Sequence, residues 1–227
     1  MGYRQNHAQR HSAGIYETIG DGDKKEAGGK GRKASRTVGA TMISYKPTKF
    51  FRKSTMDWKR EILIGHMVRQ KNAEADQSSM WEYPFPEVAA SIEQIESVEK
   101  VLGFSLDSEL RQFLLHANGW HSFLQTIDLF SAVDLVQGAR FDRANTLLQS
   151  LENLQELCGF RREELVPIAV AMEDIDVFVI STPNSANPGK VFWVAGQVID
   201  EFISFDEWFL AMVEYSRRQY RQLIGEE

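Results

Sequence analysis

Apolar side chains recur every three to four residues in several stretches of the chain, which is the period of an amphipathic α-helix. The first stretch covers residues 56–73 and begins near Asp57. Its predicted apolar face consists of Ile62, Leu63, Met67 and Val68. A second stretch starts at Ser91, which with Gln94 fits a capping box, and ends at Gly103, a residue suited to a left-handed C-cap. Further helices are predicted over 107–117, 142–157 and 204–220.

Other parts of the chain after residue 125 contain short runs of β-branched and aromatic residues separated by Asp, Asn, Pro and Gly. Such runs are typical of antiparallel strands joined by turns. The predicted strands cover 126–130, 132–136, 166–171, 176–182, 190–195 and, at a sheet edge, 198–203. We therefore expect an α+β fold, with a short, mostly antiparallel sheet and helices at both ends of the domain.

The first 55 residues lack a sustained apolar period and are rich in Gly, Lys, Arg and Ser. Such a segment cannot offset a chain entropy of ~1–2 kcal/mol per residue, so we expect it to be disordered. Pro84 and Pro86 enforce an extended connector after the first helix. Met42 and Met56 precede the first helical pattern, which suggests the hypothesis that translation starts at one of them. The predicted organisation is a disordered basic extension (1–55), an amphipathic helix with a Pro-containing connector (56–88) and an α+β domain (89–224).

Charge is distributed unevenly along the chain. Residues 1–56 carry 12 Lys and Arg against 4 Asp and Glu, a balance of +8, whereas residues 57–227 carry 14 against 28, a balance of −14. An acidic surface attracts basic partners and repels nucleic acid over the Debye length of ~8 Å. We expect no nucleic-acid binding by the folded part, although the extension could bind phosphates loosely.

Cys158 is the only cysteine, which excludes an intrachain disulfide and suits a reducing compartment. No apolar run approaches the roughly 20 residues of a membrane-spanning helix, and the first residues contain no apolar signal core. These features predict a cytoplasmic protein without membrane contact.

Cys158, His116 and His121 could supply a thiol nucleophile and its base, but Cys158 ends a predicted helix, where the helix dipole disfavours a thiolate. The two histidines are separated by Asn118-Gly119, and no further ligand at short spacing completes a zinc site. No catalytic spacing is complete, so we expect no catalytic residue, metal or cofactor. An enzyme that uses Cys158 is the remote alternative.

Two groups of residues are candidates for contact with a protein partner. The first lies in a predicted loop after Asn118-Gly119, where aromatic rings can either anchor a partner or pack in the core. The second is acidic and lies in a predicted turn and on the edge strand; the turn is either solvated or a metal or catalytic site, and in both cases it can contribute to a negative binding face. The predicted partner-binding residues are Trp120, His121, Phe123, Glu173, Asp174, Asp176, Asp200 and Glu201.

An acidic helix with a Leu-Gly end is followed by a Phe-Leu pair, an Asn-Gly pair, a Val-Pro strand and a closing helix that contains Trp. In order, these are Ser91–Gly103, Phe113-Leu114, Asn118-Gly119, Val166–Ala169 and Ser204–Leu210. This series resembles the SUKH superfamily, which takes in bacterial toxin-immunity proteins and the fungal Smi/Knr cell-wall regulators. The similarity covers about residues 89–215; Asp107 and Leu110 depart from the family's usual Pro and aromatic, and 142–157 looks like an insertion.

The resemblance implies a SUKH-like, non-enzymatic domain that binds another protein. We expect an immunity protein that neutralises a bacterial toxin by covering its active site or an adjacent surface. The acidic charge adds that this toxin is basic, for example a nuclease. The alternative is an intracellular regulatory scaffold related to the fungal cell-wall regulators.

Overall fold

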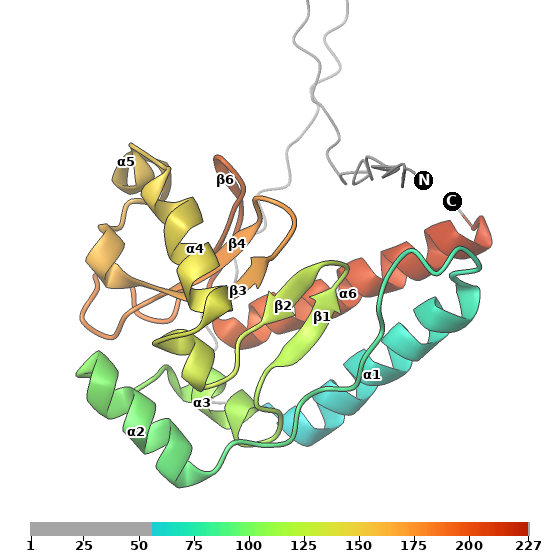
Figure 1. Ribbon diagram of the computed structural model, residues 1–227, viewed down its shortest axis with the longest axis horizontal. Helices are drawn as coiled ribbons and strands as arrows, with labels where there is room; N and C mark the ends of the chain where they lie inside the picture. The colour runs from blue at the N-terminus through green and yellow to red at the C-terminus, as the bar shows by residue number, and fades with distance from the viewer. Residues whose placement is uncertain (1–55, 227) are drawn as a thin grey trace, which may run out of the picture. The chain divides into compact units, whose positions relative to one another are not determined.

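The computed structural model describes residues 56–226 (Figure 1). The predicted disordered extension over 1–55 lies outside the described residues. The helices are α1 (Trp58–Ala75), α2 (Ile92–Leu102), α3 (Ser108–Leu114), α4 (Ala139–Gln149), α5 (Leu154–Cys158) and α6 (Phe205–Ile224), with 3-10 turns η1 (Val133–Leu135) and η2 (Arg162–Glu164). The strands are β1 (Trp120–Leu124), β2 (Ile127–Leu129), β3 (Leu165–Ala171), β4 (Val177–Ser181), β5 (Val191–Val194) and β6 (Val198–Phe202). The predicted α+β class is confirmed.

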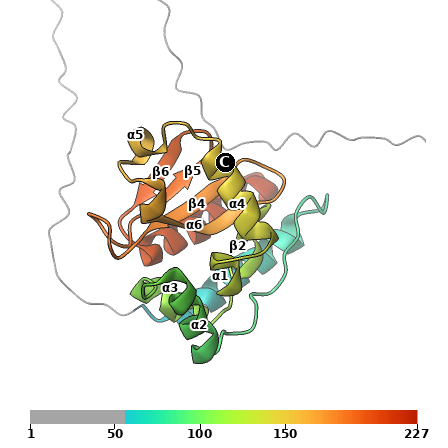
Figure 2. The same cartoon turned by 60° about the vertical axis from the view of Figure 1, so that its left-hand side comes forward.

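The strands form one sheet in the order β1-β2-β3-β4-β5-β6, and each neighbouring pair is antiparallel. Strand β6 therefore lies at an edge, as predicted. Every residue of β3, β4 and β5 is buried, because α6 crosses one face of the sheet and α4 covers the other (Figure 2). Burial on both faces explains why these runs are continuously apolar instead of alternating.

Aromatic side chains join α1 to the core. The ring of Trp58 is 2% exposed and lies 5.6 Å from Phe113, 5.5 Å from Phe205 and 5.2 Å from Phe209, measured between ring centroids. Its indole Nε1 donates a hydrogen bond of 3.0 Å to Glu109. Helix α1 thus covers core residues of α3 and α6, even though it precedes the predicted domain start at residue 89.

The predicted apolar face of α1 is wrong in part. Ile62 is buried and Val68 is half-buried, but Leu63 and Met67 are 56% and 57% exposed. The buried side consists of Trp58, Ile62, Gly65, Arg69 and Asn72. Polar residues occupy this side because they satisfy backbone carbonyls: Arg69 donates 2.9 Å hydrogen bonds to the carbonyls of Phe123 and Glu82.

Two other predicted elements differ from the structure. The predicted strand 132–136 contains the 3-10 turn η1, because Asp134 accepts hydrogen bonds from the Ser131 backbone N–H at 3.0 Å and hydroxyl at 2.7 Å, which favours a turn. The predicted helix 142–157 is divided into α4 and α5. At the break, the Ser150 hydroxyl donates to the Leu147 carbonyl at 2.6 Å.

Gly119 connects α3 to β1 in a left-handed conformation, with φ of +92°. A Cβ at this position would lie 2.7 Å from the backbone nitrogen of Ser131. Both the conformation and the close approach require glycine here. The Asn118-Gly119 pair therefore fixes how β1 leaves the helical half of the domain.

Candidate functional site

The structure places Trp120 and Phe123 in strand β1, not in a loop. Their side chains are 0% and 3% exposed, and their rings lie 5.4 Å apart. Trp120 Nε1 donates a 3.0 Å hydrogen bond to the carbonyl of Pro84. These two rings pack in the core, so they do not present a surface to a partner.

His121, between them in sequence, belongs to a charged network. Its Nδ1 lies 2.6 Å from the buried carboxylate of Asp128, and its Nε2 lies 3.2 Å from Glu82. Asp128 also accepts hydrogen bonds of 2.8 Å from the Ser122 backbone N–H and from Arg140 Nε. The imidazole is 44% exposed, so a partner can reach it. Through Glu82 and Asp128 it also links the connector to the β1–β2 hairpin.

The five predicted acidic residues do not share one face. Asp176 is buried and accepts a 2.6 Å hydrogen bond from Trp193 Nε1. Successive residues of a strand point to opposite faces, which separates Asp200 from Glu201. Burial raises the pKa of Tyr215 on α6, and the negative charge of Asp200 raises it further. Glu201 instead forms an ion pair of 2.8 Å with Lys190.

Glu173 and Asp174 lie in the turn between β3 and β4, as predicted. Glu173 is exposed, and the backbone carbonyl of Asp174 accepts a 2.7 Å hydrogen bond from Arg143 on α4. Their use by a partner stays a prediction, and the same holds for Asp200 and Glu201.

The thiol of Cys158 is half-buried at the end of α5 and lies 3.1 Å from the carbonyl of Leu154, to which it donates. Burial raises the pKa of this thiol, which leaves less of the nucleophilic thiolate at neutral pH. Among residues 56–226, no group of three or more His, Cys, Asp or Glu side chains is placed to hold a metal ion. No helix in the same range is long and apolar enough to cross a membrane.

Three carboxylates, Asp107, Glu109 and Asp206, lie near the N-termini of α3 and α6, close enough for their charges to interact. Burial raises the pKa of Asp107 and of Glu109, and the negative charge of Asp206 raises both further. Hydrogen bonds from backbone N–H groups lower the pKa of Asp107, and the hydrogen bond from Trp58 lowers the pKa of Glu109, but neither effect outweighs burial. The folded state therefore binds a proton more tightly at each of these two carboxyl groups than the unfolded chain does.

Glu109→Gln is expected to raise the melting temperature at pH 7 and to raise it much less at pH 4. A carboxyl group with a raised pKa in the folded state stabilises the protein at low pH, and this stabilisation is lost as the pH rises through that pKa. The amide removes the charge and can still accept the bond from Trp58. Thermal unfolding at both pH values tests this, with Glu96→Gln on the exposed side of α2 as the control. An equal gain from Glu96→Gln would contradict the explanation.

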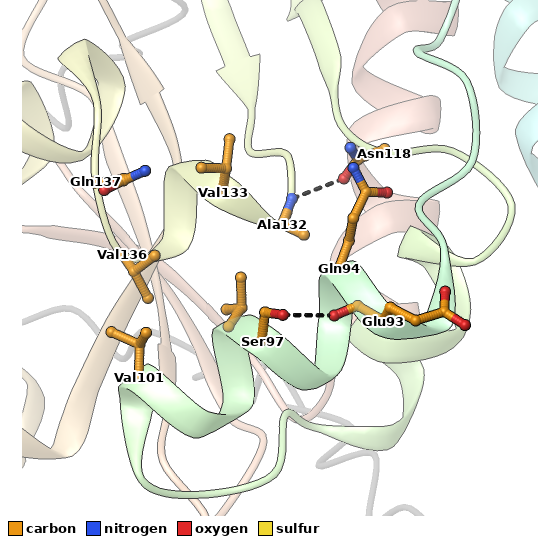
Figure 3. Close-up of a pocket in the computed structure, with 10 residues that line it drawn as sticks. Glu93, Gln94, Ser97, Val101, Asn118, Ala132, Val133, Val136 and Gln137 are labelled. Atoms are coloured by element: carbon orange, nitrogen blue, oxygen red, sulfur yellow. Dashed lines mark hydrogen bonds between the residues drawn. The ribbon is translucent and has the colours of Figure 1, made fainter.

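A groove of about 480 Å³ lies between α2 and η1 (Figure 3). Val101 on α2 and Val136 point toward one another across it (Figure 3), and Glu93, Gln94, Val98 and Val133 also line it. Val101 is 72% exposed and Val133 is 49% exposed, although both are aliphatic. The groove therefore offers apolar surface that the domain's own core does not use.

Local hydrogen bonds hold both walls of the groove in place. The capping box of Ser91 and Gln94 starts α2, and the Ser97 hydroxyl donates to the carbonyl of Glu93 at 2.7 Å (Figure 3). On the other wall, the Asn118 side-chain oxygen accepts a 2.7 Å bond from the backbone N–H of Ala132, which fixes the start of η1 (Figure 3). A rigid groove loses little entropy when it is occupied.

The rim of the groove is negative. Glu93 lines the groove and is exposed, Glu96 is exposed on α2 outside the lining, and Lys100 is the one basic residue of this helix. Hydrogen bonds from its own backbone N–H and from the Ser91 hydroxyl hold the pKa of Glu93 below its ordinary value, so it is charged at neutral pH. An apolar floor beside carboxylates suits a partner segment that combines an apolar side chain with basic neighbours.

Our sequence predictions did not identify this groove. The available signal was Val101, an aliphatic residue of α2 outside the predicted apolar face of Ile92, Ile95, Val98 and Leu102. Ile92 of that predicted face is itself 52% exposed. Two aliphatic residues of α2 are thus available at the surface.

Comparison with known families gives one match. The sequence model of the SMI1 / KNR4 family (SUKH-1) matches residues 89–211. No curated protein matches the chain. The matched range contains both walls of the groove and begins after α1.

Proposed function

Because the chain belongs to the SMI1 / KNR4 family (SUKH-1), we propose that it is an immunity-type protein that binds and neutralises a basic, nuclease-like bacterial toxin. Domains of this family mediate protein interactions, are generally non-catalytic, and occur both in immunity proteins and in cell-wall regulators. The proposed binding site is the groove between α2 and η1, and the proposed location is the cytoplasm.

The observation that carries this proposal is the combination of exposed valines and a negative rim in the groove. Val101 and Val133 can receive an apolar side chain of the partner, which is the usual anchor of a protein interface. Glu93 lines the groove with this anchor point and would face a basic residue of the toxin, and Glu96 adds an exposed negative charge on the same helix. The contact would then cover toxin surface without any chemistry by the immunity protein.

The net charge of the domain supports a basic partner. Residues 57–227 carry 14 Lys and Arg against 28 Asp and Glu. Such an imbalance speeds the encounter with a positively charged protein and makes it sensitive to salt. Nuclease toxins are basic because their substrate is a polyanion.

The proposal predicts that Glu93→Lys/Glu96→Lys weakens toxin binding by about ten- to a hundredfold, because it reverses the charge that faces the partner. The tagged full-length chain would first be purified from its own cells, and proteins that remain bound at high salt identified. The dissociation constant of the purified pair would then be measured by calorimetry. Addition of the chain should also inhibit the nuclease activity of the captured protein.

The matched control is Glu152→Lys/Glu156→Lys, which changes the net charge equally on exposed positions before and within α5. It should change the dissociation constant by less than about threefold, because long-range charge affects affinity less than local contacts. Equal effects of the two double variants would overturn the groove as the site. Capture of signalling or wall-synthesis proteins without toxin activity would support the regulatory scaffold instead.

A further inference from the structure

Helix α1 carries a second exposed surface that faces away from the core. Its buried side repeats at spacings of three and four residues, and the residues halfway around the helix form a straight outer stripe. The outer stripe consists of Arg60, Leu63, Met67, Lys71 and Glu74, all of which are exposed. Figure 1 shows α1 beside α6, with the connector that follows α1 running back along it.

The apolar part of this stripe is larger than isolated surface residues would give. Leu63 is 56% exposed, Met67 is 57% exposed, and Phe85 of the connector is 69% exposed. The ring of Phe85 lies tilted against that of His66, with 4.5 Å between ring centroids, on the side of α1 between the outer stripe and the core. Clustered large apolar side chains at a surface mark an interaction site, whereas single ones do not.

The charges of the stripe are complementary to those of the same stripe turned around. Arg60 and Glu74 each lie seven positions from Met67, which is about 10 Å along a helix axis. A two-fold axis through Met67 would therefore place Arg60 of one copy opposite Glu74 of the other, twice. It would also place Leu63 opposite the aliphatic part of Lys71. Interfaces with two-fold symmetry require this self-complementarity.

We propose that α1 is a dimerisation surface, at which the α1 helices of two copies of this chain pack antiparallel about a two-fold axis at Met67. In one copy, Arg60 Nε lies 3.8 Å from Glu61, a long contact from a 71% exposed arginine side chain that costs little to exchange for Glu74 of the second copy. Lys71 Nζ lies 6.0 Å from the centroid of the Tyr220 ring on α6. The groove is lined by neither α1 nor the connector, so each copy would keep its groove free.

Sedimentation equilibrium of the full chain tests this. The wild type should have the mass of a dimer at micromolar concentration, and Met67→Glu should be monomeric because it puts two carboxylates on the axis. Arg60→Glu should raise the dissociation constant of the dimer by about tenfold or more, since it faces Glu74 twice. The double variant Arg60→Glu/Glu74→Arg should restore it to within about threefold of the wild type, because the swap recreates both ion pairs.

Met172→Glu in the β3–β4 turn is the control, because it also puts a carboxylate in place of an exposed methionine and should leave the dimer intact. Circular dichroism would show that all variants fold, as expected for exposed positions. A monomeric wild type, a dimer unaffected by Met67→Glu, or failure of the charge swap to restore association would each overturn the proposal. Association of the wild type only with another captured protein would do so as well.

Discussion

Trp58→Ala is expected to lower the free energy of unfolding by about 3–5 kcal/mol, the range for truncation of a large buried aromatic side chain. The ring lies within 5.2–5.6 Å of three aromatic rings on α3 and α6, measured between centroids. Its loss would leave a cavity there and would also remove the hydrogen bond to Glu109. Equilibrium unfolding in urea, followed by far-UV circular dichroism, measures the change.

Ile203→Ala is the matched control, since Ile203 is apolar but 78% exposed just after β6. It should cost less than about 1 kcal/mol, as surface truncations do. If Trp58→Ala cost no more than this control, α1 could not be an integral part of the core.

Asp128→Ala is expected to lower the free energy of unfolding by about 3 kcal/mol, because it leaves the buried Ser122 N–H without an acceptor and leaves Arg140 with one carboxylate partner, Asp134, instead of two. The carboxylate holds Arg140 and the Ser122 backbone N–H, each at 2.8 Å. Ser122 has a left-handed φ of +47°, which is strained for a residue with a side chain. The bond from its N–H stabilises this strained turn of β1.

His121→Ala removes another member of the same network and should cost only about 1 kcal/mol, because the imidazole is partly in solvent. The two variants would be compared by urea unfolding at pH 7. Equal losses would mean that the histidine contact, not the buried carboxylate, carries the stability of the hairpin.

Local signals in the sequence were sufficient for much of the fold. The capping box at Ser91 and the left-handed Gly103 correctly bounded α2, because caps depend on neighbouring residues alone. The strand runs after residue 165 were also predicted correctly, since β-branched residues bounded by turn residues indicate strands without knowledge of their partners.

The sequence predictions failed where contacts between segments far apart in the sequence determine which residues are buried. The inward side of α1 includes Arg69 because carbonyls of Phe123 and Glu82 lie there, and periodicity of apolar residues cannot show a buried arginine. Trp120 and Phe123 followed a turn signal and were placed in a loop, but α1 and α6 bury them.

The candidate site was difficult to predict for the same reason. Its walls come from α2 and from η1, more than 30 positions apart in sequence, and η1 was predicted to be a strand. The acidic residues that were chosen instead are spread over two sheet faces, and Asp176 is buried. The count of acidic residues along the sequence did not specify where on the domain a partner would bind.

The buried guanidinium of Arg69 also limits how the chain can be shortened. A fragment that begins at residue 89, where the family match starts, would lack Arg69 and Trp58 and would open the rings of Trp120 and Phe209 to water. We expect such a fragment to aggregate instead of folding alone. Helix α1 lies outside the matched range, so in this chain a segment beyond the family's conserved part closes the core while leaving the groove untouched.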